Sequence, residues 1–385
     1  MTQSQSRPKR VLYIAPNSKL GGAEQCVLLL GRHHDRTRWT PLIYCLSDGP
    51  LVSELRAAGV TCYVPDLARP RLKDPASVFR TVLDIVRVIR REQIDLVHSV
   101  MGYAHLFGGI ASKIASVPEL WFQHGPTDTI DWLTARVPTD LLVVNSQYTL
   151  EKQRRFHAWA KKITTIHPGT EARRPDDVTS QSEVASALRI KYGIRSDETV
   201  FTLMARISPM KGHLLFLQAA ADLKKQSVMA KFLIAGETFL PSDQSYELEV
   251  KKAVTDLGLD EDVIFTGFVR ESQTATLLAS DCIVNASIID EPFGLTLIEG
   301  MMLGRPVIAP RAGGPLEIIE NEKNGLFFTP RDPRSLADKM KQIALGPDLR
   351  TTLGQYAKIS AQHRFGIEKM TTDLESEYDL LTHSL

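Results

Sequence analysis

Two kinds of apolar pattern alternate along the whole chain. Short β-branched runs predict buried strands, and longer stretches with an apolar residue every three or four positions predict amphipathic helices. Such alternation predicts parallel sheets covered by helices on both faces. The predicted strands of the first half are Val11–Ala15, Pro41–Cys45, Thr61–Val64, Leu96–Ser99, Leu120–His124 and Leu141–Asn145. Those of the second half are Val200–Ala205, Ala230–Ala235, Val263–Thr266, Cys282–Ala286 and Pro306–Ala309.

One sheet containing all of these strands would be unusually wide, so the pattern predicts two Rossmann-like domains, residues 1–172 and 197–364. Residues 173–196 begin with Arg, Pro, Asp, Ser and Thr, which predicts an irregular linker. Residues 365–385 contain a helical pattern, Ile367–Leu381, with no strand after it. This helix could pack anywhere, including back across the first domain.

Composition narrows the class of protein. The 385 residues are 43% hydrophobic and 24% charged, as in a globular soluble protein, and the formal net charge is +1. This balance argues against a nucleic-acid partner. No apolar run approaches the length of a membrane span, and the four cysteines show no CxxC pairing. We therefore expect a cytoplasmic protein with reduced thiols.

The most informative stretch holds two carboxylates separated by seven residues, Glu291 and Glu299. Glu291 follows a predicted strand. Gly294 allows close backbone approach, and the amides of Gly294, Leu295 and Thr296 would open a helix, which is an anion-binding arrangement. Glu299 lies about one and a half turns further along and faces the same ligand. Carboxylates on both sides of an anion site suit a nucleotide sugar; an ordinary loop with two solvated glutamates is the alternative.

Two cations follow the first strand of the second half. Arg206 and Lys211 lie on a loop with Pro and Gly, and their spacing suits a clamp on a diphosphate. Ligands of open α/β sheets bind at this end of the strands, although a solvated basic loop would look similar. Gly21 and Gly22 follow the first strand of the chain and could cradle phosphate. They match neither the dinucleotide fingerprint nor the P-loop, and a plain turn explains them equally well.

Two further signals are weaker. His124 ends an apolar strand beside Gly125, which fits either a hydrogen-bonded structural residue or a cleft position. Asp260 and Asp262 match a carboxylate pair that binds Mg²⁺ or Mn²⁺ on nucleotide diphosphates. However, they lie between a helix and the start of a strand, so we expect a surface turn and no metal. Zinc-ligand spacing and a GxSxG elbow are both absent from the sequence.

Two basic stretches lie in the first half, Arg71–Arg91 and Lys152–Lys162, the second interleaved with Phe156 and Trp159. Solvated helix faces explain both. The sharper hypothesis is contact with anionic lipid or with an anionic acceptor.

Together these residues resemble the retaining glycosyltransferases of family four, which use nucleotide sugars and have the GT-B fold of two facing Rossmann-like domains. The resemblance covers nearly the whole chain. It rests on Gly21–Glu24, His124–Gly125, Arg206 with Lys211, Gly236–Glu237, Glu291–Glu299 and Phe365–Met370. One departure is His167–Gly169, where the family often has Asn-Gly. The resemblance implies a donor site in the C-terminal domain, an acceptor site in the N-terminal domain, and a C-terminal helix packed toward the latter.

The resemblance also implies a role for each residue. The implied catalytic set is Arg206, Lys211, Glu291 and His124, in which the two cations hold the diphosphate, Glu291 binds the donor sugar's hydroxyls and His124 lies against that sugar. Glu299 would bind the ribose hydroxyls. The other implied donor contacts are Gly236, Gly294, Leu295 and Thr296, with Phe268 and Val269 beside the base. Gly21 and Gly22 would lie near the diphosphate and the acceptor.

The expected activity is transfer of a hexose-type sugar, with UDP favoured over GDP as the nucleotide. Two cations and helix amides could stabilise the departing diphosphate without a metal or another cofactor. The acceptor would be a hydroxyl of a glycan, a lipid-linked precursor or a small molecule, with possible peripheral contact at the inner membrane face. The alternatives are a nucleotide-sugar 2-epimerase of the same fold and a non-catalytic nucleotide-sugar-binding scaffold; a sugar phosphorylase fits less well.

Overall fold

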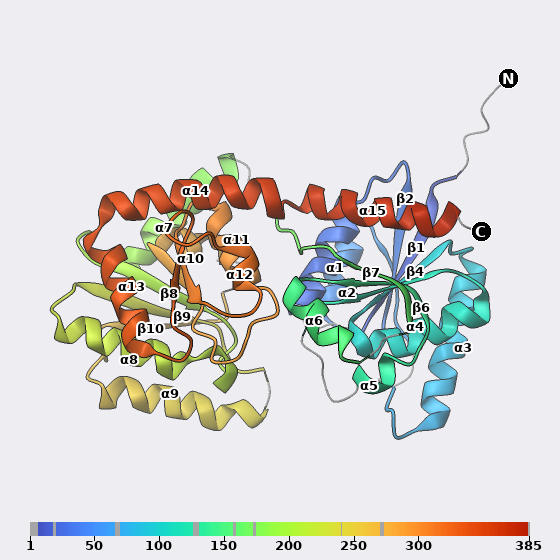
Figure 1. Ribbon diagram of the computed structural model, residues 1–385, viewed down its shortest axis with the longest axis horizontal. Coiled ribbons are helices and arrows are strands. Elements are labelled where there is room, and N and C mark those ends of the chain that lie inside the picture. Colours follow the sequence, from blue (N-terminus) through green and yellow to red (C-terminus); the bar gives the residue numbers. More distant parts are fainter. Residues whose placement is uncertain are drawn as a thin grey trace. The chain divides into compact units, whose positions relative to one another are not determined.

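The computed structural model describes residues 7–17, 21–65, 70–125, 131–156, 159–171, 175–239, 241–269 and 273–383. The chain forms two compact units (Figure 1). Unit 1 contains residues 1–171 and 366–385, and unit 2 contains residues 172–365. Each unit has one parallel sheet with helices packed against it, which confirms the predicted pair of Rossmann-like folds.

The sheet of unit 1 has the strand order β3-β2-β1-β4-β5-β6-β7, with every neighbouring pair parallel. Its strands are β1 (Lys9–Ala15), β2 (Trp39–Cys45), β3 (Thr61–Tyr63), β4 (Leu96–Val100), β5 (Glu119–Gln123), β6 (Thr139–Val144) and β7 (Ala160–Thr165). All but β7 were predicted. Strand β7 lies at the sheet edge, where exposed lysines give it a polar sequence and hide its strand character.

The helices of unit 1 pack on both faces of this sheet. They are α1 (Gly22–His33), α2 (Pro50–Ala57), α3 (Pro75–Arg91), α4 (Met101–Ala115), α5 (Asp131–Thr134), α6 (Gln147–Arg154) and α15 (Ile367–His383). Leu12 and Ile14 of β1 share one core cluster with Ile85 of α3 and Phe107 of α4. Tyr13, between them, points to the other face and contacts α15. Successive side chains of β1 therefore point to opposite faces of the sheet, and each face is covered by its own layer of helices.

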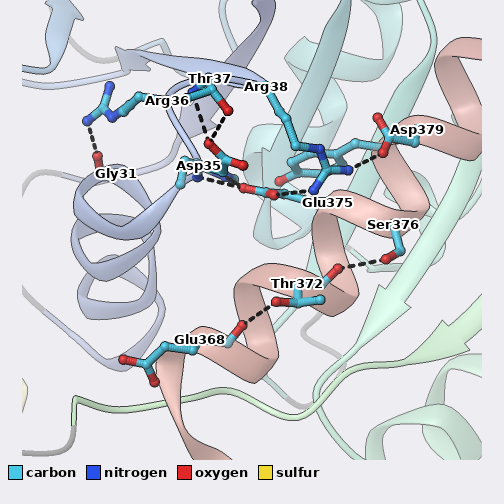
Figure 2. Close-up of polar contacts among 12 residues, drawn as sticks. Gly31, Asp35, Arg36, Thr37, Arg38, Glu368, Thr372, Glu375, Ser376 and Asp379 are labelled. Atoms are coloured by element: carbon cyan, nitrogen blue, oxygen red, sulfur yellow. Dashed lines mark hydrogen bonds and ion pairs between the residues drawn. The ribbon is translucent and has the colours of Figure 1, made fainter.

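The C-terminal helix α15 is anchored to unit 1 by a buried carboxylate (Figure 2). Glu375 accepts hydrogen bonds from His34 Nδ1 at 2.8 Å and from the backbone amide of Asp35 at 3.0 Å. Arg38 forms an ion pair with the same carboxylate at 3.0 Å and another with Asp379. The helix pattern at the end of the sequence thus packs on the first unit, as the resemblance implied.

Hydrogen bonds among aromatic side chains extend this anchor into the sheet. Tyr13 Oη lies 2.6 Å from His34 Nε2 and 2.8 Å from Tyr378 Oη. Tyr378 Oη in turn lies 2.5 Å from His98 Nδ1. Burial lowers the pKa of both His34 and His98, so both imidazoles are neutral at physiological pH. The helix is therefore fixed by a polar network as well as by apolar packing.

We expect Glu375→Ala to destabilise unit 1 strongly. The change leaves the buried His34 and the Asp35 amide without their acceptor, which costs about 2 kcal/mol. The thermal midpoint should fall by roughly 4–8 °C. The control is Glu377→Ala on the same helix, because Glu377 pairs only with the exposed Lys162 among the contacts that the structure resolves. Equal midpoints for the two variants would contradict the anchoring role.

Gly169, at the point where the sequence departs from the family pattern, lies against the start of α15. A Cβ at Gly169 would lie 2.8 Å from the carbonyl oxygen of Gly366. Beside it, the amide of Ile367 donates to the carbonyl of Thr170 at 3.0 Å. The two segments that lead out of unit 1 are therefore paired side by side, and only glycine fits at position 169.

The sheet of unit 2 has the strand order β10-β9-β8-β11-β12-β13 and is also parallel. Its strands are β8 (Thr199–Met204), β9 (Ala230–Ala235), β10 (Val263–Gly267), β11 (Cys282–Val284), β12 (Val307–Pro310) and β13 (Leu326–Phe328). The sequence pattern missed only β13, a three-residue strand at the edge of this sheet. Phe201 and Phe232 pack under α8 (His213–Lys225) and α9 (Gln244–Asp256), whereas Ile283 and Val307 pack under α11 (Leu295–Met302) and α14 (Pro347–Phe365).

The helices of unit 2 are α7 (Pro175–Lys191), α8 (His213–Lys225), α9 (Gln244–Asp256), α10 (Gln273–Ala279), α11 (Leu295–Met302), α12 (Pro315–Ile318), α13 (Pro333–Leu345) and α14 (Pro347–Phe365), with short 3-10 turns η1 (Pro209–Lys211) and η2 (Pro241–Asp243).

The irregular linker predicted within residues 173–196 is wrong, because helix α7 occupies most of it. Its polar composition suggested a loop, but one side of the helix packs against α10. Ala185 is buried, and Arg189 donates to the carbonyl of Ala279 at 2.9 Å and pairs with Asp281 at 3.2 Å. Tertiary contacts therefore outweigh a weak local preference.

Candidate functional site

The strand order of unit 2 brings two loops together at one position. The chain winds from β8 outward through β9 to β10, and later from β11 outward through β12 to β13. The sheet therefore reverses direction between β8 and β11, and open α/β sheets bind ligands at such a point, beyond the carboxyl ends of the strands. The loop after β8 carries Arg206 and Lys211, and the loop after β11 carries Glu291.

A glycine fixes the contact between these two loops. Gly212, directly after Lys211, has a φ of 70°, and a Cβ there would lie 1.8 Å from the carbonyl oxygen of Ala286. Only glycine allows this conformation and this approach. The amide of Ile288 also donates to the carbonyl of Met210 at 3.0 Å. The backbone thus places Lys211 beside the loop that follows β11.

Lys211 and Glu291 meet in this position. Lys211 Nζ lies 2.8 Å from Glu291 Oε1 and 2.7 Å from Oε2, and Ser287 Oγ donates to Oε2 at 2.8 Å. Burial alone would raise the pKa of Glu291. The charge of Lys211 and the hydrogen bonds from Lys211, Ser287 and Asn285 outweigh burial, so this pKa is lower than usual and the carboxyl group is ionised.

The loop after β12 supports the backbone of the Glu291 loop. Gly314 donates its amide hydrogen to the carbonyl of Glu291 at 2.7 Å. A Cβ at Gly313 would lie 2.5 Å from that same oxygen, and one at Gly314 would lie 2.4 Å from Phe293 Cα. The Gly-Gly-Pro sequence directly after a predicted strand is the local signal for the supporting role of Gly313 and Gly314.

Helix α11 begins where the anion site was predicted. Gly294 precedes it with a φ of 127°, and the amides of Leu297 and Ile298 donate to the Gly294 carbonyl at 3.0 and 3.4 Å. The amides of Leu295 and Thr296 lie in the first turn, where a helix offers no acceptor of its own, so they can bind an anion.

Glu299 lies on α11, and Gln273 Nε2 at the start of α10 donates to its Oε2 at 2.9 Å. Sequence reasoning did not find Gln273, because glutamine at a helix start carries no recognisable motif.

Arg206 differs from Lys211 in its surroundings. Its side chain is half-buried, and within the parts of the chain that the structure describes no carboxylate lies at ion-pair distance. The loop after β9 supports its backbone, because Gly236 has a φ of 152° and a Cβ there would lie 2.0 Å from the Ala205 carbonyl oxygen. The amide of Ile207 also donates to the carbonyl of Glu237 at 2.9 Å. Arg206 is thus held in place with its guanidinium available for a ligand.

The loop after β10 carries the residues predicted to frame a base. Phe268 is 50% exposed, and its ring makes an edge contact with Phe239 at a centroid distance of 6.0 Å. Phe239 follows β9, so two neighbouring strand ends contribute to this aromatic pair. Val269 is partly buried against the core of unit 2.

The remaining predicted residues belong to unit 1. His124 follows β5, and its ring stacks on Phe122 with centroids 3.9 Å apart. Burial lowers the pKa of His124 to about 3, so its imidazole is neutral. Gly21 precedes α1 and donates its amide hydrogen to Glu24 Oε2 at 3.2 Å, and Gly22 is the first residue of α1. Three residues of this glycine loop, 18–20, lie outside the described residues.

Two family models match most of this chain. Residues 20–174 match the model described as Glycosyltransferase Family 4, and residues 185–360 match the model described as Glycosyl transferases group 1. The chain belongs to the group 1 glycosyltransferases of family 4. Its two parallel Rossmann-like sheets are those of the GT-B fold.

Among its relatives is the putative glycosyltransferase EpsD of Bacillus subtilis, 28% identical over 71% of this chain and 67% of EpsD. A D-inositol 3-phosphate glycosyltransferase of Saccharomonospora viridis is 27% identical over 62% of this chain and 55% of that protein. These matches therefore span about half to two thirds of each relative.

Solved structures resemble this glycosyltransferase over nearly its full length. The Anabaena protein HepE in complex with UDP is 25% identical, with a TM-score of 0.80 over 97% of this chain and 100% of HepE. HepE in complex with UDP-glucose is 24% identical, with a TM-score of 0.82 over 96% and 99% of the two chains.

The carboxylates Asp260 and Asp262 lie at the other edge of the sheet in this glycosyltransferase. They form a turn between α9 and β10, at the amino end of the strand, as predicted. Asp262 pairs with Lys224 at 2.7 Å, and Asp260 accepts a hydrogen bond from Thr255 at 2.8 Å. No cluster of three or more His, Cys, Asp or Glu side chains in the described ranges is placed to hold a metal.

The two basic stretches differ in structure. Arg80, Arg87 and Arg90 are exposed along α3, so the first stretch is a helix face. The second is not a single helix face, because α6 ends at Arg154 and β7 begins at Ala160. Two of its lysines form ion pairs, Lys161 with Asp140 and Lys162 with Glu377, both at 2.7 Å. Of the helices that the structure describes, none is long and apolar enough to span a membrane.

Proposed function

We propose that this glycosyltransferase moves a hexose-type sugar from a nucleoside diphosphate sugar to an acceptor hydroxyl, with retention and without a metal. The observation that carries the proposal is the grouping of Arg206, the Lys211–Glu291 pair and the first-turn amides of α11 where the sheet of unit 2 reverses direction. Positive charge for a diphosphate and a carboxylate for sugar hydroxyls lie side by side there.

Stabilisation of the leaving group would come from these cations. A departing nucleoside diphosphate gains charge in the transition state, and preorganised donors that face this charge lower the barrier. Arg206 can donate in a fork to two phosphate oxygens, and Lys211 acts as a point charge. The amides of Leu295 and Thr296 add two further donors. With this much positive charge, the mechanism needs no metal ion.

The rest of the donor would lie along the neighbouring strand ends. Glu299, held by Gln273, would accept hydrogen bonds from the ribose hydroxyls, and Phe268 would lie beside the base. Glu291 would accept hydrogen bonds from hydroxyls of the transferred sugar. His124 is kept as a proposed contact for the sugar, because its neutral ring can donate or accept one hydrogen bond.

Retention needs no nucleophile from the protein in this proposal. The departing phosphate can take the proton of the acceptor hydroxyl on the same face of the sugar, so the new bond forms where the old one breaks. The two-carboxylate scheme of glycoside hydrolases is therefore not assigned to Glu291 and Glu299 in this proposal.

UDP is the favoured nucleotide because HepE was crystallised with UDP and with UDP-glucose. The proposed acceptor is a glycan, a lipid-linked precursor or a small molecule. A lipid-linked acceptor is supported by α3, which presents exposed arginines beside Phe79, itself 64% exposed. Such a surface would attach peripherally to anionic lipid, at the inner membrane face of a cytoplasmic enzyme, and would release in salt.

Two measurements test the function. Thermal stabilisation across UDP-, GDP- and ADP-sugars identifies the donor, and turnover with an acceptor extract then tests transfer, with and without EDTA. Transfer with retention that persists in EDTA supports the proposal. An epimeric nucleotide sugar formed without acceptor would indicate a 2-epimerase, and binding without turnover would indicate a scaffold.

Sedimentation with anionic vesicles at low and high salt tests the lipid contact, and no sedimentation at either salt concentration favours a soluble acceptor.

A further inference from the structure

Two side chains proposed to bind different parts of the donor bind each other in this structure. Lys211 is proposed for the diphosphate and Glu291 for the hydroxyls of the sugar. Yet Lys211 Nζ contacts both carboxylate oxygens of Glu291 at 2.8 and 2.7 Å. Their side chains are 25% and 16% exposed, so water screens the pair only partly. Any phosphate that binds Lys211 must compete with this carboxylate.

The competition has a different outcome for the donor and for the product. A nucleotide sugar brings hydroxyl donors to Glu291 as its diphosphate engages Lys211, so both charged groups keep partners. A free nucleoside diphosphate engages Lys211 and offers Glu291 nothing. Glu291 would then keep its hydrogen bond from Ser287 but lose its cation, and a partly buried carboxylate without a counter-charge is unfavourable.

We propose that the Lys211–Glu291 ion pair makes this site select the intact donor over the nucleoside diphosphate that transfer releases. The inference rests on the proposed function and adds a specificity role for Glu291 that is separate from contact with the sugar. The ion pair would also affect turnover. When the sugar has been transferred, Lys211 and Glu291 pair again, which lowers the affinity of the site for the nucleoside diphosphate product.

Ser287 has a defined part in this exchange. Its hydroxyl donates to Glu291 Oε2 at 2.8 Å from the same loop, so it holds the carboxylate in place whether or not Lys211 is bound to it. Ser287 is therefore a positioning residue, and the backbone of the loop is fixed independently through Gly314.

The test measures dissociation constants for UDP and UDP-glucose by calorimetry. In Glu291→Gln the ammonium group of Lys211 has no charged competitor, so UDP should bind about tenfold tighter while UDP-glucose gains little or loses affinity. UDP should also become a stronger product inhibitor. Glu291→Ala serves as a second variant with the same expected direction, and thermal midpoints establish that each variant is folded. Glu261→Gln, an exposed glutamate in the turn before β10, is the control and should leave both constants unchanged.

A double-mutant cycle identifies the route of the effect. If Glu291 acts on UDP through Lys211, the tenfold gain should disappear in a Lys211→Met background. Unchanged or weaker UDP binding in folded Glu291→Gln and Glu291→Ala would overturn the inference, as would a full gain without Lys211. Failure of the proposed function looks different, because the native protein would then transfer no sugar from any nucleotide sugar to an acceptor, whatever its dissociation constant for UDP.

Discussion

Replacing Arg206 with alanine is expected to lower the kcat of sugar transfer by about 10²- to 10³-fold, the typical cost of removing one preorganised donor from a developing negative charge. Arg206 is half-buried at the end of β8, and its backbone is fixed by the contact with Gly236. Within the described parts of the chain its guanidinium has no carboxylate partner, unlike Lys211. Its charge is therefore available for the leaving diphosphate of the proposed reaction.

Two further variants make this measurement specific. Arg206→Lys keeps the charge but loses the forked donor geometry, so its kcat should lie between those of the native protein and Arg206→Ala. Arg334→Ala removes an exposed arginine from α13 of the same unit and should leave kcat unchanged. Initial rates at saturating donor provide the comparison, and an Arg206→Ala rate within threefold of the native rate would remove Arg206 from the reaction.

Replacing Glu299 with alanine should weaken UDP binding at least about tenfold. A carboxylate that accepts hydrogen bonds from ribose hydroxyls makes charge-assisted bonds of about 1.5–3 kcal/mol each, and truncation removes them. Gln273→Ala should have a smaller effect of the same sign, because it removes only the hydrogen bond that orients Glu299. Calorimetric dissociation constants for UDP test both variants.

Pyrophosphate is the matched ligand for this prediction, because it presents the diphosphate without the ribose. Its affinity should be unchanged in Glu299→Ala and reduced in Arg206→Ala. Equal losses for UDP and pyrophosphate in Glu299→Ala would show that the variant disturbs the loop rather than a ribose contact. Unchanged UDP affinity would remove Glu299 from the site.

The local sequence predicted most of the fold because most of its elements are long and buried. Strand β1 contains the apolar run Val11–Ala15, and every residue of β8 is buried. Helix α3 buries Val82, Ile85 and Ile89, which recur every three or four residues along one side. The same strands predicted where the site would lie. The residue at which each strand ends can be found from the local sequence, and ligands of parallel sheets bind at the carboxyl ends of the strands.

By contrast, β7, β13 and α7 carry little local signal. Strand β7 is a polar edge strand, β13 is a short strand at the edge of its sheet, and α7 has a loop-like composition that its packing against α10 overrides. In each case neighbours distant in sequence supply the stabilisation, so a pattern read over a few residues cannot find them.

The sequence by itself determined the alternation of strands and helices, the family, and the residue types present at each strand end. Only the tertiary structure decided which of those residues meet. The pairing of Lys211 with Glu291, the support of Glu299 by Gln273 and the docking of Glu375 against His34 all join segments far apart in the chain. Such contacts depend on strand order and on close backbone approaches such as that at Gly212, and the packing of the whole unit fixes both.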